Sequence, residues 1–464
     1  MEDDIIDNKE EEVISMKEKD LVIIYSKDNE AIEKDYSKCI SCGYCVKTCR
    51  DEVTVARMYE IKRSIEPICI NCGQCVNMCP TESIHEKFDY LRLKKLLKDK
   101  SIVKTVSIAP AVRVAIGEEF GGDLGENLEG RVVTALRKLG FDYVFDITFG
   151  ADLTIMEEAM ELVNRIKNKG TLPMFTSCCP AWVKYAEIFY PEFIPNLSSC
   201  KSPITMQSTM IKTYFADKKK ISAKDILNVV IAPCTAKKSE IKRDEVNRSG
   251  VSDTDFVLTT RELALLLKEE GIDLISLENG TFDSPLGKGS SAGLIFGNSG
   301  GVLEAALRTA YYYLTGENLS KEKLVFNEVR GMEGIKEASI MIDDLEIKVA
   351  VLNGMKNAKI LLDKIKSGEV TYHFVEVMNC LGGCIAGGGQ PKSTLLNLDK
   401  TKLARMNSIY KEDEKAKLRF CHENPEIKEI YKDFLEYPNS PKAKGLLHTT
   451  YQDKSYLLGG KSHE

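Results

Sequence analysis

Eight of the fifteen cysteines lie in two short segments that share the spacing C-x2-C-x2-C-x3-C. The first segment contains Cys39, Cys42, Cys45 and Cys49, and the second contains Cys69, Cys72, Cys75 and Cys79. Three closely spaced thiolates can hold three corners of a 4Fe–4S cubane, while the fourth cysteine ligates the other cluster. We therefore predict one cluster on the first three cysteines plus Cys79, and a second on Cys69, Cys72 and Cys75 plus Cys49. A pair of zinc knuckles or a redox CxxC motif is the alternative, and the doubled spacing disfavours both.

A second group of cysteines follows segments that we predict to be buried strands. Cys178 and Cys179 follow LPMFT, Cys234 follows ILNVVIAP and Cys380 follows YHFVEVM, with Cys384 close behind. Open α/β sheets bind ligands outside the carboxyl ends of their strands, so these thiols are expected to converge on one deep iron–sulfur site. Glycines within 382–391 allow the backbone to approach a bulky cofactor closely. Ordinary buried core cysteines are the alternative for any one of them.

Alternating strand and helix signals begin near Thr105 and predict an α/β fold with parallel or mixed sheets flanked by helices. The other expected strands are TVSIAP, YVFDITF, DFVLTT and KVAVLNG. Helical patterns cover Asp152–Lys167, Arg261–Glu270 and Lys356–Lys366. The chain is expected to begin with a charged extension (1–36), which contains a strand-like run at Leu21–Tyr25, and to continue with a small α+β two-cluster domain (37–90) and a linker (91–104). The α/β domain (105–401) and a helical C-terminal segment (402–464) follow.

Composition narrows the function classes. Hydrophobic residues make up 43% and charged residues 29% of the chain, with a net charge of −6, as in soluble globular proteins. The sequence has no apolar run of about 18 residues, which argues against a membrane span. The acidic N-terminus does not have the form of a secretory signal, and no basic stripe suggests nucleic acid. A cytoplasmic protein is expected, in which so many cysteines bind iron–sulfur clusters rather than form disulfides.

Two carboxylates in the predicted helix Asp152–Lys167 suggest proton transfer. Glu158, Glu161 and Arg165 lie on one face, because residues three, four and seven apart share a helix face. Carboxyls buried beside apolar residues are costly unless paired or protonated, and burial would raise their pKa toward the range of a relay. From the pattern alone, a solvated charged face is the favoured interpretation.

Three longer motifs resemble the signature segments of FeFe (iron-only) hydrogenases and occur in the same order. They are TSCCPAW (176–182), PCTAKKSE (233–240) and EVMNCLGGCIAGGGQP (376–391). SIAPAVR, FGADLTIMEEAMEL, SGGVLEAALR and CHENP are also similar to the family. The eight-cysteine segment resembles a bacterial two-cluster ferredoxin, and the whole likeness covers about residues 37–450.

The resemblance implies an H-cluster, a 4Fe–4S cubane joined through one cysteine to a diiron unit with carbonyl, cyanide and azadithiolate ligands. By motif position, its protein ligands would be Cys179, Cys234, Cys380 and the bridging Cys384. Lys237 would hydrogen-bond a cyanide, since an ammonium beside an anionic ligand is favourable. The other residues expected around the cofactor are Met378, Phe296, Pro110 and Pro233.

The resemblance also implies an activity and a proton route. The expected reaction is reversible interconversion of H2 with protons and electrons, with ferredoxin as electron partner and maturation proteins delivering the diiron unit. Protons would pass along Glu161, Ser198, Glu158 and Cys178, with Arg165 at the outer mouth, and Cys178 as the last donor. A hydrogen-sensing relative and a hydrogenase-like iron–sulfur assembly protein are the alternatives.

Five residues remain apart from this pattern. Ala232, Ala111 and Ile204 stand where methionine, serine and glutamine are common in the family. We expect these changes to alter catalytic bias, potential or inhibitor response without abolishing activity. Cys200 and Cys421 fit no ligand role, and buried, inert thiols are the default expectation for both.

Overall fold

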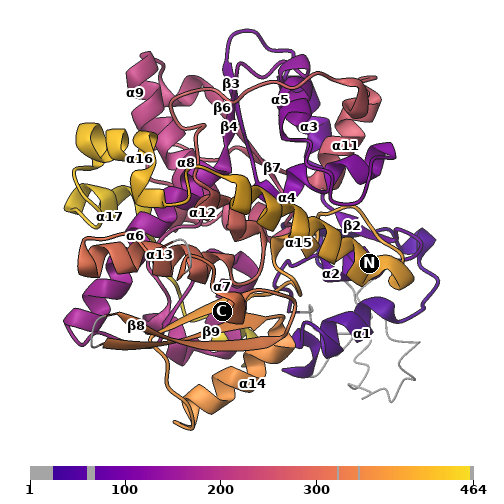
Figure 1. Cartoon of the computed structure of the whole chain (residues 1–464). Coiled ribbons are helices and arrows are strands. Elements are labelled where there is room, and N and C mark those ends of the chain that lie inside the picture. The colour runs from indigo at the N-terminus through magenta and orange to yellow at the C-terminus, as the bar shows by residue number, and fades with distance from the viewer. Residues whose placement is uncertain (1–24, 60–67, 321–322, 343–344, 460–464) are drawn as a thin grey trace, which may run out of the picture.

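The computed structural model describes residues 25–59, 68–320, 323–342 and 345–459. The strand-like run expected at Leu21–Tyr25 lies, except for Tyr25, outside the described residues. Figure 1 shows two β-sheets surrounded by helices, with the cysteine-rich part at one side of the molecule. The fold is α/β, as the alternation of strand and helix patterns predicted.

The first sheet is entirely parallel and has the order β4-β3-β6-β7. Its strands are β3 (Val103–Ile108), β4 (Tyr143–Asp146), β6 (Ile226–Ala232) and β7 (Phe256–Thr259). All seven residues of β6 are buried, because a parallel strand inside a sheet is covered on both faces. Helices α5 (Glu129–Lys138) and α11 (Thr260–Glu269) contribute apolar side chains to the same core.

The second sheet has the order β5-β10-β9-β8. It contains β5 (Met174–Phe175), β8 (Ile335–Ile342), β9 (Leu345–Asn353) and β10 (Phe374–Met378). β10 pairs in parallel with β5 and β9, whereas β8 is antiparallel to β9. The sequence prediction omitted β8, whose alternating polar residues suit an edge strand exposed on one face.

The long helix α6 (Ile147–Lys167) packs against α8 (Pro203–Met210) and α13 (Gly301–Thr315). It begins five residues before the predicted helix because Asp146, at the end of β4, caps it by accepting a hydrogen bond from the Thr148 backbone N–H. Of its 21 residues, 15 are buried. Side chains on α6 therefore face the interior on most sides.

The cysteine-rich part is a small α+β unit. Strands β1 (Ile32–Lys34) and β2 (Ile84–Glu86) pair antiparallel, and the helices are α1 (Tyr44–Asp51) and α2 (Gln74–Met78). Arg261 of α11 forms an ion pair with Glu86 at 2.8 Å, and Thr235 Oγ1 donates to the Asn71 carbonyl at 2.6 Å. This unit is thus bonded directly to the larger part of the chain.

The stretch 91–104, which we expected to be a linker, has regular structure. Residues Tyr90–Leu96 form α3, and β3 begins at Val103. Leu93 is fully buried, and Lys94 pairs with Glu269 and Glu270 at the C-terminal end of α11. The alternation of apolar and basic residues here is that of an amphipathic helix docked on α11, and not of a solvated connection.

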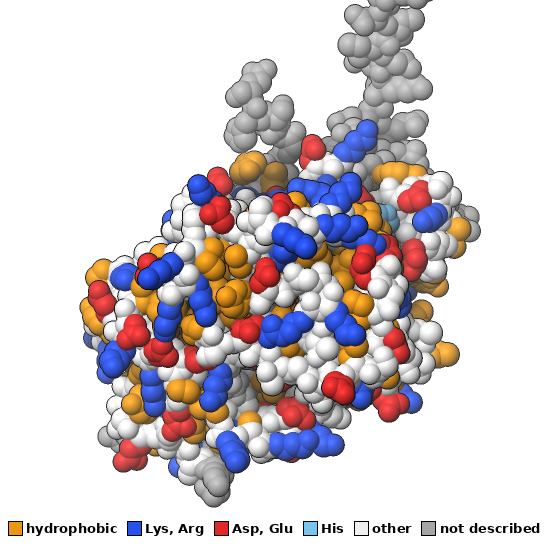
Figure 2. Space-filling model, turned by 90° about the horizontal axis from the view of Figure 1, so that it is seen from above, with side chains coloured by type: hydrophobic (Ala, Val, Ile, Leu, Met, Phe, Trp, Pro, Cys, Tyr) orange, Lys and Arg blue, Asp and Glu red, His pale blue; other side chains and the backbone are white. Residues whose placement is uncertain are grey.

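The C-terminal part is helical, as expected. It contains α15 (Leu398–Lys415), α16 (Pro425–Ile430) and α17 (Pro441–Leu447). The expected boundary at residue 402 falls inside α15, which crosses the molecule in Figure 1, while α16 and α17 lie beside α8 and α9 (Ala216–Lys219). No helix among the described residues has the length and apolarity required to cross a membrane. Figure 2 shows a face on which positive and negative side chains are interspersed.

Candidate active site

Five cysteines from both sheets line one internal cavity. Cys178 and Cys179 follow β5, Cys380 follows β10, and Cys234 follows β6 of the other sheet. Cys384 begins a short helical turn in the glycine-rich loop after β10. The cavity therefore lies where strand ends from the two sheets meet, which is the position expected for a ligand site in an α/β protein.

The remaining walls of this cavity include every other residue that we expected around the cofactor: Lys237, Met378, Phe296, Pro110 and Pro233. Lys237 follows β6 in α10 (Ala236–Glu240), where its Nζ donates to the Cys178 carbonyl at 2.9 Å and pairs with Glu240 at 2.8 Å. Burial lowers the pKa of Lys237, but the charge of Glu240 and nearby thiolates outweighs it and the pKa is raised. Lys237 is thus a buried cation at the cavity wall.

Two glycines of the loop after β10 let its backbone pack against neighbouring backbone more closely than a side chain would allow. Gly383 has φ +96°, and a Cβ there would lie 2.4 Å from the Ser299 backbone nitrogen. A Cβ at Gly388 would lie 2.1 Å from the carbonyl oxygen of Cys72, so this loop also contacts the cysteine-rich part. Four thiols, one ammonium and otherwise mainly apolar walls fit an iron–sulfur cubane joined to a group with anionic ligands.

Ala111, Ile204 and Ala232 also line the cavity. The three departures from the usual family pattern therefore lie together around the site, where each removes a polar or sulfur contact. Their effect on catalytic bias, potential or inhibitor response stays a prediction.

The eight N-terminal cysteines divide between two smaller cavities in the predicted crosswise manner. One is lined by Cys39, Cys42, Cys45 and Cys79, and the other by Cys49, Cys69, Cys72 and Cys75. The division follows from the two helices. Gly43 and Gly73, both with positive φ, cap the N-termini of α1 and α2, and Cys49 and Cys79 lie about one helical turn after the third cysteine of their motif. Gln74 of α2 donates to Cys380 Sγ at 3.1 Å, which links the second cavity to the large one.

The expected proton-transfer residues form a connected group along α6. Arg165 Nη2 lies 2.6 Å from Glu161 Oε1, and Ser198 Oγ donates to Glu161 Oε2 at 3.1 Å. Arg165 also donates to the backbone carbonyls of 195–197, which fixes it beside Glu161. The solvated charged face that the pattern alone favoured is therefore wrong, because Glu158 is 1% exposed and Glu161 is mostly buried.

Glu158 is the buried group of this set that lacks a hydrogen bond. Neither carboxylate oxygen has a partner, although Ser198 is near enough to lower its pKa somewhat. Desolvation dominates and raises the pKa of Glu158 to about 8. Desolvation, followed by the charge of Glu158, also raises the pKa of Cys178. A neutral carboxyl that is poised to gain or lose a proton at neutral pH lies next to the cavity thiol.

This shift predicts a pH-dependent stability. A carboxyl whose folded-state pKa is about 8 rather than the ordinary 4.5 binds more protons in the folded state, so its contribution to stability is lost as pH rises between these values. The glutamine of Glu158→Gln cannot ionise, so the melting temperature of this variant relative to wild type should be higher at pH 9 than at pH 5. The corresponding change in the free energy of unfolding, relative to wild type, is at most about 5 kcal/mol. Calorimetry of both holoenzymes measures it, and equal differences at the two pH values would contradict the assignment.

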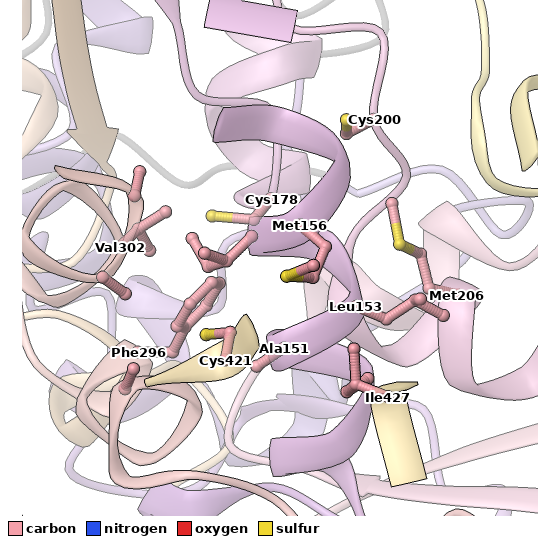
Figure 3. Close-up of a cluster of buried hydrophobic side chains, with 14 of the residues drawn as sticks. Ala151, Leu153, Met156, Cys178, Cys200, Met206, Phe296, Val302, Cys421 and Ile427 are labelled. Atoms are coloured by element: carbon pink, nitrogen blue, oxygen red, sulfur yellow. The ribbon is translucent and has the colours of Figure 1, made fainter. Parts of the chain in front are cut away.

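A second polar group lies beside Glu161, and no local sequence pattern indicated it. Ser199 Oγ lies 2.7 Å from His448 Nδ1, and His448 Nε2 lies 3.0 Å from Glu157 Oε2. Figure 3 shows the two remaining thiols, Cys200 and Cys421, near α6 but apart from Cys178. Both are fully buried, as expected. His448 is distant in the chain, so only the folded structure brings it to this place.

The fold and the sites together define an iron–sulfur redox enzyme with a ferredoxin-like part joined to an α/β catalytic part. Three family models match the chain: "Iron only hydrogenase large subunit, C-terminal domain" over residues 103–388, "Iron hydrogenase small subunit" over 399–454, and "4Fe-4S dicluster domain" over 38–84. The chain belongs to the FeFe (iron-only) hydrogenases, and its cofactors are 4Fe–4S clusters and the H-cluster.

Individual relatives agree with this placement. Iron hydrogenase 1 of Clostridium pasteurianum is 41% identical over 442 residues, covering 91% of this chain and 76% of the relative. A solved structure of the apo FeFe hydrogenase of Chlamydomonas reinhardtii is 42% identical with a TM-score of 0.69, covering 78% of this chain and 99% of that chain. The cytosolic Fe–S cluster assembly factor narfl of Danio rerio is more distant, at 30% identity over 82% of this chain and 94% of the relative.

Proposed function

We propose that this hydrogenase catalyses the reversible interconversion of H2 with protons and electrons at the cavity between the two sheets. The observation that carries the proposal is the convergence of five thiols and one buried lysine on a mainly apolar cavity, beside a buried carboxyl without a hydrogen bond. Such a site combines metal ligands with a nearby proton donor, as redox chemistry that moves both electrons and protons requires.

The residues that would hold the cubane of the H-cluster are Cys179, Cys234, Cys380 and Cys384, and Cys384 would be the one shared with the diiron unit. When bound, the H-cluster supplies the iron centre at which hydrogen is split or formed. Lys237 is then positioned to hydrogen-bond an anionic ligand from the cavity wall. The H-cluster would be enclosed, and water excluded from it, by four further residues of the cavity wall: Met378, Phe296, Pro110 and Pro233.

The proposed electron route passes through the two N-terminal clusters. Cys42 is exposed, whereas Cys72 and Cys75 are buried, so the first cluster lies nearer the surface. Gln74 and Gly388 bring the second cluster's loop against the loop of Cys380 and Cys384.

We propose ferredoxin or a similar carrier as the external partner, maturation proteins as the source of the diiron unit, and the cytoplasm as the location. The N-terminal extension, two-cluster, catalytic and C-terminal parts are proposed as the domains.

The proposed proton route begins at Arg165 and passes through Glu161, Ser198, Glu158 and Cys178. Hydrogen bonds already connect the first three side chains. Glu158, held mainly neutral by burial, would pass its carboxyl proton to Cys178 once that thiol has given up its own proton at the cavity, and would then be reprotonated from the Ser198 side. Arg165 marks the outer mouth, and from Glu161 inward each residue holds or transfers one proton, so the route does not require bulk water in the cavity.

The crosswise assignment predicts unequal effects of two serine variants. Cys49→Ser should perturb the cluster on Cys69, Cys72 and Cys75, and leave the one on Cys39, Cys42 and Cys45 intact, although Cys49 belongs to the first motif. Cys79→Ser should do the reverse. Electron paramagnetic resonance and iron content of the purified variants measure this. Loss of the cluster nearest in sequence in each variant would contradict the assignment.

A hydrogen-sensing relative and an iron–sulfur assembly protein are the competing functions, the second because narfl-type relatives share the fold region. Lys237, Met378 and the connected proton-transfer residues favour catalysis, since an assembly role without a diiron unit requires none of them. Rates of H2 evolution and oxidation by the matured holoenzyme, with reduced or oxidised ferredoxin, test the proposal. Rapid turnover is expected. Very slow turnover with the complete cofactor would favour the sensor, and an inability to bind the diiron unit would favour the assembly protein.

A further inference from the structure

Three different metal-binding side chains meet beside the proposed proton route. Glu161 of α6, Cys200 just before α8, and His448 after α17 each present one donor atom, and these atoms all lie within 4.8 Å of one another. Cys200 is fully buried and His448 is 8% exposed. A carboxylate, a thiol and an imidazole form a mixed O, S, N donor set, which Zn²⁺ binds readily.

We propose that this group, here called the Glu161 triad, is a binding site for Zn²⁺ or a similar thiophilic divalent cation. Donor atoms around a tetrahedral Zn²⁺ are about 3.5 Å apart, given the usual Zn–ligand distances. Cys200 Sγ already lies 3.7 Å from Glu161 Oε2. Little movement is therefore needed to close the triad on a cation.

Neighbouring groups orient two of the three donors. Arg165 holds Glu161 through Oε1 at 2.6 Å, which leaves Oε2 on the side of Cys200. Glu157 Oε2 contacts the far nitrogen of His448, and Tyr431 in turn donates to Glu157. A carboxylate on the far nitrogen of a ligating histidine is a recurrent second-layer arrangement at zinc sites. Ser199 Oγ now lies between His448 Nδ1 and Glu161 Oε2, at 2.7 and 3.1 Å, and must rotate away.

A surface groove approaches the triad at one residue. Cys200 lines it together with Ser177, Lys201, Thr449 and Tyr451, whereas Glu161 and His448 do not. Binding converts the Cys200 thiol to a thiolate, so one proton leaves to solvent as the Zn–S bond forms, and no electron is transferred. Water completes the coordination from the groove side.

The consequence for catalysis rests on the proposed function. A cation on Glu161 Oε2 displaces the hydrogen bond from Ser198 at that oxygen. Protons then cannot pass from Arg165 toward Glu158, while electrons still reach the clusters. Zn²⁺ is thus expected to inhibit H2 evolution and oxidation reversibly without blocking reduction of the clusters by dithionite.

Direct binding is tested on the iron-loaded holoenzyme with Zn²⁺ alone. One Zn²⁺ per chain is expected by equilibrium dialysis with elemental analysis, and anomalous scattering at the zinc edge should locate it at the triad. Cys200→Ala and His448→Gln should each weaken binding by about 100-fold, and Glu157→Gln by about tenfold. Cys421→Ala and His422→Gln are matched controls, as another buried thiol and histidine, and should bind like wild type. Absence of saturable Zn²⁺ binding, or binding that survives both triad variants, would overturn the site.

Inhibition is measured separately, as the Zn²⁺ concentration that halves each protein's own rate, with reversal by a chelator. The full proposal is supported if Cys200→Ala and His448→Gln raise the Zn²⁺ concentration needed for binding and the concentration needed for inhibition by the same factor. Zn²⁺ bound at the triad without inhibition would leave the site standing and would instead remove Glu161 from the proton route.

Discussion

Cys178→Ala should reduce H2 evolution and oxidation by about 10³-fold or more, because it removes the only proposed proton donor at the cavity. Cys178 lines the cavity beside Cys179, but in the proposed ligand set it binds no iron. Infrared bands of carbonyl and cyanide should therefore persist in the matured variant. Rates and infrared spectra from one preparation measure both properties.

Cys421→Ala is the matched control for this result. Cys421 is also a fully buried thiol of the same core, but it contacts Ser290 and does not line the cavity. It should keep nearly the rate of wild type. Full activity of Cys178→Ala with intact bands would reject the relay, whereas loss of the bands would show that Cys178 is needed to hold the cofactor.

Glu158→Gln should slow both directions of the reaction by about 10²-fold or more, because the amide keeps the size of the carboxyl but cannot exchange the proton. The effect should be on kcat, since Glu158 is 1% exposed and does not line the surface groove. A deuterium solvent isotope effect should increase as proton transfer becomes rate-limiting. Steady-state rates in H2O and D2O measure this.

Asp152→Asn is the control for the second result. Asp152 is a fully buried carboxyl on the same helix, where burial raises its pKa to about 6, but it is bonded to Ser290 and Asn424 rather than placed in the route. It should change the rates far less than Glu158→Gln. Equal slowing by both variants would indicate that general loosening of α6, and not proton transfer, limits the rate.

Much of this architecture was predictable because its causes are local. Buried parallel strands such as β6 are continuous apolar runs, and the cysteines that follow them must lie at one edge of a sheet. The repeated cysteine spacing likewise predicts the crosswise arrangement, since a short helix carries each fourth cysteine one turn away from the other three.

Other features depend on contacts between distant segments. The apolar residues of α3 pack against α11, which lies far away in the sequence. The local pattern does not show this contact, and for that reason the sequence predicts a linker where the structure has a helix. The face of Glu158 and Glu161 looked solvated because nothing near them in the chain shows that α8 and α13 cover α6. His448 reaches Ser199 across 249 positions, and local pattern contains no information on such a pairing.

The central claim is that thiols from separate strand ends hold one iron assembly. The most direct measurement is an iron-edge anomalous map from crystals of the matured holoenzyme. The account predicts a group of iron atoms bonded to Cys179, Cys234, Cys380 and Cys384, with two further irons beside Cys384 near Lys237. Iron bound elsewhere, or a cavity in which these four thiols bind no iron, would contradict it.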